Sequence, residues 1–186
     1  MTPSEGDRTR LRERRRALTP PERLADIEAS RAVTQVLDEL GPSSVGLYFT
    51  HDGELDPAPV GVMARVAGRT TWYPVSVDES LVYRRWDGSE ALEPGRFGIP
   101  VPPGHDDVEV PSLDVVIAPL VAFDAACNRA GHGLGFYDRA LADAANRPTL
   151  IGLAYDFQEL EPWEPQPWDV AMDLIVTPTR VLRRAR

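Results

Sequence analysis

The sequence LDVVIAPL at positions 113–120 is the most apolar run of the chain, and GHGLG follows it at positions 131–135. A continuous apolar run of this length is typical of a strand that is buried on both faces of a parallel sheet. After the glycines, apolar positions recur on one side of a predicted helix, at Tyr137, Ala140, Leu141 and Ala144. Residues 121–135 are expected to form a long irregular loop. A buried strand, a glycine-rich loop and a helix in this order predict an α/β fold.

The segments on either side extend this alternation. A helix is predicted over 19–40, because Thr19, Pro20 and Glu22 resemble a helix start and Gly41 follows the last apolar position. Further helices are predicted at 8–18 and 59–66, and further strands at 45–49, 70–74, 81–86, 150–155 and 174–177, with a loop over 87–111. We therefore expect a three-layer α/β/α fold, Rossmann-like, with a mainly parallel central sheet. The length of 186 residues predicts one domain over 1–186.

The charges are distributed unevenly along the chain. There are 20 basic and 29 acidic residues, yet the first 23 residues hold seven arginines and only four acids. An acidic body repels nucleic acid, whereas a short basic segment can attract one polyanionic small molecule such as a nucleoside triphosphate. The chain has no lysine, which excludes a Schiff-base lysine and a P-loop lysine.

The cysteine count and the apolar pattern indicate a cytoplasmic protein. Cys127 is the single cysteine, so neither an intramolecular disulfide nor a zinc site built from several thiolates is possible. No apolar stretch approaches the roughly 20 residues of a membrane-spanning helix, and the arginine-rich start lacks the apolar core of a signal peptide. We expect a monomer with no membrane partner and no nucleic-acid partner.

The glycine-rich loop is the first candidate site. Three glycines let backbone N–H groups approach a phosphate closely, and the following helix adds the positive end of its dipole. Because the spacing is neither the dinucleotide motif nor a P-loop, a flexible connection explains it equally well. Asp138 lies in the first turn of that helix and Asp173 begins a strand, so the two could bind Mg²⁺ beside a phosphate. Alternatively, Asp138 stabilises a helix start and Asp173 a strand-end turn.

Other polar residues lie where parallel strands usually present ligand sites. Glu54 and Asp56 follow the strand at 45–49, where they could accept N–H donors from a heterocycle such as a pterin or simply face solvent. Cys127 and His132 flank the glycine loop, but no partner spacing supports a zinc site. The N-terminal arginines could bind a triphosphate, bind nucleic acid or cover a solvated helix face.

Together these motifs resemble the 5-formyltetrahydrofolate cyclo-ligase family, whose members are also called methenyltetrahydrofolate synthetases, over nearly the full chain. The most specific matches are the segment from Asp114 to Asp124, the pair Asn128-Arg129 and the segment from Gly131 to Arg139. Supporting matches lie at 14–18, 22–23, 54, 56, 94–100, 151–156 and 169–177.

The resemblance implies an ATP- and Mg²⁺-dependent conversion of 5-formyltetrahydrofolate to 5,10-methenyltetrahydrofolate, with release of ADP and phosphate. In the family's chemistry the formyl oxygen attacks the γ-phosphate, N10 closes the ring and phosphate leaves, so no protein nucleophile is assigned. The implied ATP contacts are Arg8, Arg12, Arg129, Ala130, Gly131, His132, Gly133, Leu134, Gly135, Phe136 and Tyr137. The implied folate contacts are Phe49, Glu54, Phe97, His132, Gly133, Leu134, Gly135 and Phe136, and the implied Mg²⁺ ligands are Asp138 and Asp173.

Five positions depart from the family pattern. Ser4 and Asp7 stand where the N-terminal element of the family has a lysine and a leucine. Leu134 replaces a glycine or lysine in the loop, where a side chain could narrow the approach to phosphate. Val101 and Trp168 replace an acid and a histidine.

These departures leave one alternative to the cyclo-ligase, a paralogue that binds nucleotide or folate without turnover. The arginine run leaves a second, a nucleic-acid-binding protein. In the cyclo-ligase interpretation, Arg10 or Arg12 would have to replace the missing cation of the N-terminal element.

Overall fold

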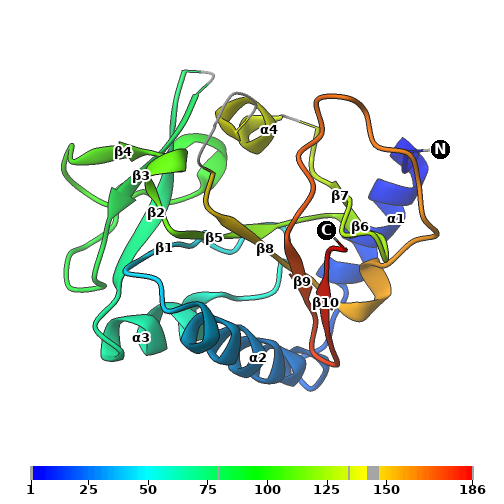
Figure 1. Cartoon of the computed structure of the whole chain (residues 1–186), viewed down its shortest axis with the longest axis horizontal. Coiled ribbons are helices and arrows are strands. Elements are labelled where there is room, and N and C mark those ends of the chain that lie inside the picture. The colour runs from blue at the N-terminus through cyan, green and yellow to red at the C-terminus, as the bar shows by residue number, and fades with distance from the viewer. Residues whose placement is uncertain (1, 79, 134, 142–146, 186) are drawn as a thin grey trace.

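A mixed sheet runs through the middle of the protein (Figure 1). The computed structural model describes residues 2–78, 80–133, 135–141 and 147–185, and within them the sheet has eight strands in the order β10-β9-β8-β5-β1-β2-β3-β4. The strands are β1 (Ser44–Gly46), β2 (Thr70–Val77), β3 (Ser80–Arg85), β4 (Asp107–Glu109), β5 (Val115–Pro119), β8 (Thr149–Leu153), β9 (Leu174–Val176) and β10 (Val181–Arg183). The five strands β9, β8, β5, β1 and β2 are parallel to one another. At one side of the sheet β10 pairs antiparallel with β9, and at the other side β3 and β4 continue the sheet in antiparallel pairs.

Strand β5 lies at the centre of the parallel part, as its apolar sequence predicts. It pairs with β1 on one side and β8 on the other, and its first four residues are buried. The strand predicted at 45–49 is shorter in the structure, because β1 ends at Gly46. Leu47 donates one more backbone bond to Trp72, and the chain then leaves the sheet toward a loop that holds Glu54.

Helices cover both faces of the sheet, which confirms the three-layer α/β/α prediction. Helices α2 (Ala25–Leu40) and α3 (Ala58–Val66) pack on one face, and α4 (Phe136–Leu141) packs on the other (Figure 1). Each face has its own hydrophobic core, with Val33 and Leu37 of α2 in one and Leu141 of α4 in the other.

The N-terminal part of the helix predicted over 19–40 is different in the structure. Thr19 and Glu22 are hydrogen-bonded as predicted, and Gly41 ends the helix with a φ of 64°. Between them, a 3-10 turn at Glu22–Leu24 precedes the α-helix, which starts only at Ala25. The capping pair therefore belongs to the turn that leads into α2.

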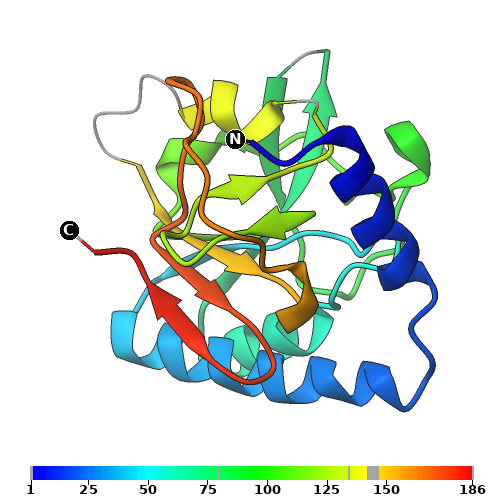
Figure 2. The same ribbon diagram turned by 90° about the vertical axis from the view of Figure 1, so that its right-hand side faces the viewer.

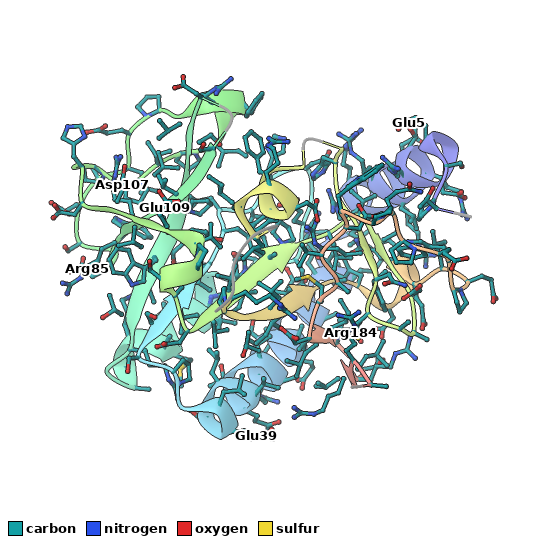
Figure 3. The ribbon with its side chains drawn as sticks, turned by 45° about the horizontal axis from the view of Figure 1, so that its top comes forward. Glu5, Glu39, Arg85, Asp107, Glu109 and Arg184 are labelled. Atoms are coloured by element: carbon teal, nitrogen blue, oxygen red, sulfur yellow. The ribbon has the colours of Figure 1, made fainter. Side chains whose placement is uncertain are left out.

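Helix α1 (Glu5–Arg16) stands apart from the layer of α2 and α3, beside a small hairpin (Figure 2). It carries Glu5 at its start, on the side of the protein opposite the β3–β4 edge with Arg85, Asp107 and Glu109 (Figure 3). None of the described helices is long and apolar enough to cross a membrane.

The prediction of an irregular loop over 121–135 is wrong. Strands β6 (Ala122–Phe123) and β7 (Arg129–Ala130) form an antiparallel hairpin there. Its turn is held by Asp124, whose carboxylate accepts from the backbone and side-chain amides of Asn128, each at 2.9 Å. Strands of two residues are too short to produce a period in the sequence, which is why the pattern does not reveal them. Leu134 and Ala144 lie outside the described residues.

Candidate functional site

A cavity of about 1130 Å³ opens over the carboxyl ends of the parallel strands. Its floor is formed by Pro119 at the end of β5, by Phe49 after β1 and by Pro74 in β2. Its walls come from α1, the loop after β1, the segment 94–101, the glycine loop with α4, and the segment 163–169. The predicted site residues that line it are Arg8, Arg12, Phe49, Glu54, Phe97, Arg129, Ala130, Gly131, His132, Gly133, Gly135, Phe136, Tyr137 and Asp138. The carboxyl edge of a parallel sheet is the usual location of ligand sites in such folds.

The glycine loop needs glycine at two of its positions. Gly133 and Gly135 have φ values of 88° and 64°, which other residues adopt only with strain. A side chain at Gly133 would meet Arg8, whose Nη1 lies 3.7 Å from the expected Cβ position. The N-terminal helix and the glycine loop therefore touch across the cavity, although about 125 positions separate them in the sequence.

Arg129 and Asp138 form an ion pair on the cavity wall. The Arg129 Nη2 lies 2.5 Å from the Asp138 Oδ1, which also accepts from the backbone N–H of Val170 at 3.0 Å. The Arg129 guanidinium lies 5.6 Å from the ring centre of Tyr137, whose hydroxyl contacts that of Tyr83 at 3.2 Å. Burial raises the pKa of Tyr137 to about 12, so its phenol stays neutral at physiological pH. This wall offers a cation beside a carboxylate.

The loop after β1 holds a buried acid. Glu54 is only 4% exposed, and its carboxylate accepts from the backbone N–H of His51 at 3.1 Å. Burial raises the pKa of Glu54 to about 7, although Arg15 opposes this rise. Asp56, another acid of this loop, instead accepts from the backbone N–H of Ala58 and holds the start of α3. Of these two acids, Glu54 is the one that lines the cavity.

Aromatic rings form the apolar part of the cavity. Phe49 stacks on Tyr73 with ring centres 4.5 Å apart and meets the edge of Trp86. Phe97 is 55% exposed at a φ of 59°, with the Arg96 guanidinium over its ring. Such surfaces suit the flat ring system of a bound heterocycle.

Three arginines of α1 bind the carboxylate of Asp52 in the loop after β1, a contact that the sequence analysis missed. Asp52 accepts from Arg12 at 2.6 Å and from Arg15 at 3.1 Å, and Arg16 binds its other oxygen. The positively charged arginines hold the pKa of Asp52 well below its ordinary value despite its partial burial. The spacing of Arg8, Arg12 and Arg15 by four and three residues is a signal that they share one helix face.

The two positions that depart from the family at the N-terminus form the cap of α1. The backbone N–H of Asp7 donates to the Ser4 hydroxyl at 3.1 Å, and that of Ser4 donates to the Asp7 carboxylate at 3.2 Å. Arg10 pairs with Asp7 on the exposed side of the helix, whereas Arg12 lines the cavity. Of the two arginines that could replace the missing lysine, Arg12 is therefore the one in position.

The structure does not bring Asp173 to the cavity, so the predicted pair of Asp138 and Asp173 does not form. Asp173 precedes β9 at the amino end of the parallel strands, where it binds both guanidinium nitrogens of Arg147 and the backbone N–H of Leu150. The cavity lies at the opposite, carboxyl end. Asp169 lines the cavity instead, next to Val170, whose backbone N–H bonds Asp138.

The single cysteine does not line the cavity. Cys127 is buried in the hairpin turn, and burial raises its pKa. Within the residues that the structure describes, no three side chains of His, Cys, Asp or Glu converge as a metal centre would require. Mg²⁺ is commonly held by one or two carboxylates together with water and substrate phosphate oxygens.

The chain is similar to known proteins over most of its length. Residues 3–178 match the 5-formyltetrahydrofolate cyclo-ligase family. The chain is 34% identical to a 5-formyltetrahydrofolate cyclo-ligase of Escherichia coli (strain K12) over 179 residues, which cover 92% of this chain and 98% of that protein. It is 31% identical to the corresponding protein of Haemophilus influenzae over 180 residues, covering 91% and 95%. An NMR structure of Aquifex aeolicus 5,10-methenyltetrahydrofolate synthetase aligns with a TM-score of 0.85 at 26% identity, covering 97% of this chain and 92% of that one.

Proposed function

Because the chain belongs to the 5-formyltetrahydrofolate cyclo-ligase family, we propose that its cavity is where 5-formyltetrahydrofolate and ATP meet and the ring of 5,10-methenyltetrahydrofolate is closed. The chain is an enzyme of the ring-closing ligase class in folate metabolism, with ATP as its co-substrate. The observation that carries the proposal is one cavity that combines a buried carboxylate, aromatic rings and several arginines.

The folate binds in the part of the cavity formed by the loop after β1. The Glu54 carboxylate accepts hydrogen bonds from the N–H groups of the pterin, and Phe49 and Phe97 contact its flat ring and the adjoining aryl group. His132 and the glycines at 131, 133 and 135 border both substrates. Burial of Glu54 strengthens each of these hydrogen bonds, because little water competes for the carboxylate.

The triphosphate binds between α1 and the glycine loop. Arg8, Arg12 and Arg129 supply positive charge, and the backbone N–H groups of 130–133 and 135–137 approach the phosphate oxygens. The γ-phosphate is then directed at the formyl oxygen of the folate, so that positioning and charge neutralisation carry the reaction. The formyl oxygen leaves with the phosphate after N10 has attacked the formyl carbon.

A divalent cation is part of the proposal. Asp138 has the donor type that Mg²⁺ prefers, it lines the cavity beside Arg129, and Asp169 is a second acid in the same wall. When bound with ATP, Mg²⁺ neutralises phosphate charge and limits the conformations of the triphosphate. Asp173 is not part of this proposal, because Arg147 and the backbone of Leu150 engage its carboxylate at the other end of the sheet.

The test is a turnover assay with purified protein, 5-formyltetrahydrofolate, ATP and Mg²⁺, in which the absorbance of methenyltetrahydrofolate is followed. We expect product only when both ATP and the metal are present, and we expect ADP in equal amount. Folded protein that binds ATP and folate but forms no product would instead support the paralogue without turnover. The monomeric state, the cytoplasmic location and the absence of a nucleic-acid partner stay predictions, which sedimentation, fractionation and salt-dependent binding assays would test.

A further inference from the structure

We propose that Arg15 is a positioning residue of the folate site: through one buried guanidinium it fixes Glu54, in the loop after β1, relative to His132, in the glycine loop. The proposal rests on the proposed function, because it assigns a role to a residue behind the same site. Arg15 is 1% exposed, and it does not line the cavity itself. Its effect on a substrate would therefore pass through its neighbours.

The guanidinium joins three segments that are far apart in the sequence. Its Nε donates to the backbone oxygen of Asp52 at 2.9 Å, and its Nη2 donates to the carboxylate of the same residue at 3.1 Å. Its Nη1 donates to the backbone oxygen of Leu120, at the end of β5, at 3.1 Å. A planar fork with five N–H donors can serve three directions at once, which an ammonium group cannot do with the same geometry.

The same group faces the two site residues. Its Nη2 lies 3.8 Å from the Glu54 Oε1 and 3.4 Å from the His132 Nε2. The loop also packs directly on the helix backbone, because a Cβ at Gly53 would lie 2.9 Å from the Arg15 carbonyl oxygen. Arg15 thus sets the distance between the folate loop and the glycine loop.

The groups around Glu54 determine how loss of Arg15 would change the pKa of Glu54. Arg12 and Arg15 face it from α1, Asp52 from its own loop, Tyr48 from the end of β1 and Tyr137 from α4. Among these, Arg15 acts most strongly to lower the pKa of Glu54. Without Arg15 a larger share of Glu54 would hold a proton near neutral pH. A protonated carboxyl keeps fewer lone pairs for the N–H donors of a pterin, so folate binding would weaken.

The experiment compares Arg15→Met with Arg16→Met. Arg16 binds the same Asp52 carboxylate, but its side chain is half exposed and its guanidinium pairs with Asp52 and not with Glu54 or His132. For Arg15→Met we expect the KM for 5-formyltetrahydrofolate at pH 7.5 to rise about 10-fold and the KM for ATP to change less than about 3-fold. The pH profile of kcat/KM for the folate should move by about one unit toward higher pH. Arg16→Met should keep the wild-type profile.

Two further variants separate positioning from general loss of structure. Arg15→Lys retains the charge and should restore the wild-type pH profile, even where the KM stays raised. In a Glu54→Gln background, Arg15→Met should add little to the folate KM, because the group through which it acts is already neutral. If Arg15→Met does not fold, Arg15→Gln, which keeps donors for the backbone oxygens, replaces it with the same expected pH shift.

The outcomes are distinct. A wild-type pH profile in folded Arg15→Met or Arg15→Gln would overturn the inference, and so would equal effects on the KM values of folate and ATP. Absence of ATP-dependent product with the wild-type protein would contradict the proposed function instead.

Discussion

The two ends of the parallel sheet use the same residue type for different purposes. At the amino end, the Asp114 carboxylate accepts from the backbone N–H groups of Ser43 and Ser44 at 2.8 and 2.9 Å, and Asp173 does the same for Leu150. At the carboxyl end, Asp52 and Asp138 face arginine side chains around a cavity. Both aspartates at the amino end accept backbone N–H groups at strand starts, and Asp173 also binds Arg147, whereas Asp52 and Asp138 at the carboxyl end hold arginines beside the cavity.

The carboxyl end also holds buried charged groups and residues with left-handed backbone. Arg15 and Glu54 are charged groups that are nearly inaccessible to water, and Asp52 and Phe97 have positive φ values of 53° and 59°. Buried charges and left-handed backbone are destabilising unless nearby contacts compensate for them. Arg15, Glu54, Asp52 and Phe97 all lie in or beside the cavity, and such costly features are typical of binding sites.

The sharpest test of this comparison is to neutralise one aspartate at each end. Asp138→Asn should lower kcat/KM by about 100- to 1000-fold, because a carboxylate beside the triphosphate is lost. Asp173→Asn should leave kcat/KM within about 3-fold, because its carboxylate binds Arg147 and the backbone away from the cavity. Steady-state kinetics measure both. Comparable losses in the two variants would show that the ends are not functionally distinct.

The stability cost at the carboxyl end should depend on pH. Glu54 holds its proton more tightly in the folded protein than in the unfolded chain, since burial raises its pKa from 4.5 to about 7. The folded state therefore loses stability as the pH rises between these values, by up to about 3 kcal/mol. Glu54→Gln should remove this loss, so its free energy of unfolding relative to wild type should increase from pH 5 to pH 8. Urea unfolding at the two pH values provides the measurement, and an unchanged difference would contradict the buried ionised state.

The same substitution should damage folate binding. At pH 8, where wild-type Glu54 is mostly ionised, Glu54→Gln should raise the KM for 5-formyltetrahydrofolate about 10- to 30-fold, because a charged acceptor is replaced by a neutral one. The KM for ATP should change little. Asp56→Asn serves as the control in the same loop, since Asp56 does not line the cavity. An equal effect of the two variants would exclude a specific role for Glu54.

The smallest expected effect is at the amino end. Asp114→Ala should lower the free energy of unfolding by about 1–2 kcal/mol, because two backbone N–H groups lose their acceptor, and should leave the kinetics unchanged. Backbone hydrogen bonds from Ser44 and Ser43 lower the pKa of Asp114, so its contribution is present above the ordinary pKa and is lost as the pH falls below it. Urea unfolding should therefore show a larger difference at pH 7 than at pH 3. A change in folate KM would instead indicate coupling between the two ends.

Much of the site could be anticipated from local sequence. The glycine loop and Glu54 follow predicted strands, so they were expected at the carboxyl edge, and Phe49 was implied by the family resemblance; the structure finds all three around one cavity. The structure does not place Asp173 beside Asp138, because Asp173 precedes its strand. In a parallel sheet, a residue before a strand lies at the opposite edge from a residue after one. The residue before β9 could have been assigned to the amino edge from this rule alone.

The sequence by itself determined the buried strand within 113–120 and the helix end at Gly41, because each depends on neighbours within a few residues. Which two of the three loop glycines have a positive φ was decided by the structure. Only the tertiary structure decided that Arg15 is buried and that Asp52 is its partner. In the sequence, Arg15 does not differ from the other arginines of its helix. Its partners Asp52, Leu120 and His132 lie 37, 105 and 117 positions away. Burial of a charge depends on groups that folding brings together, and the periodicity of a single segment carries no information about such distant groups.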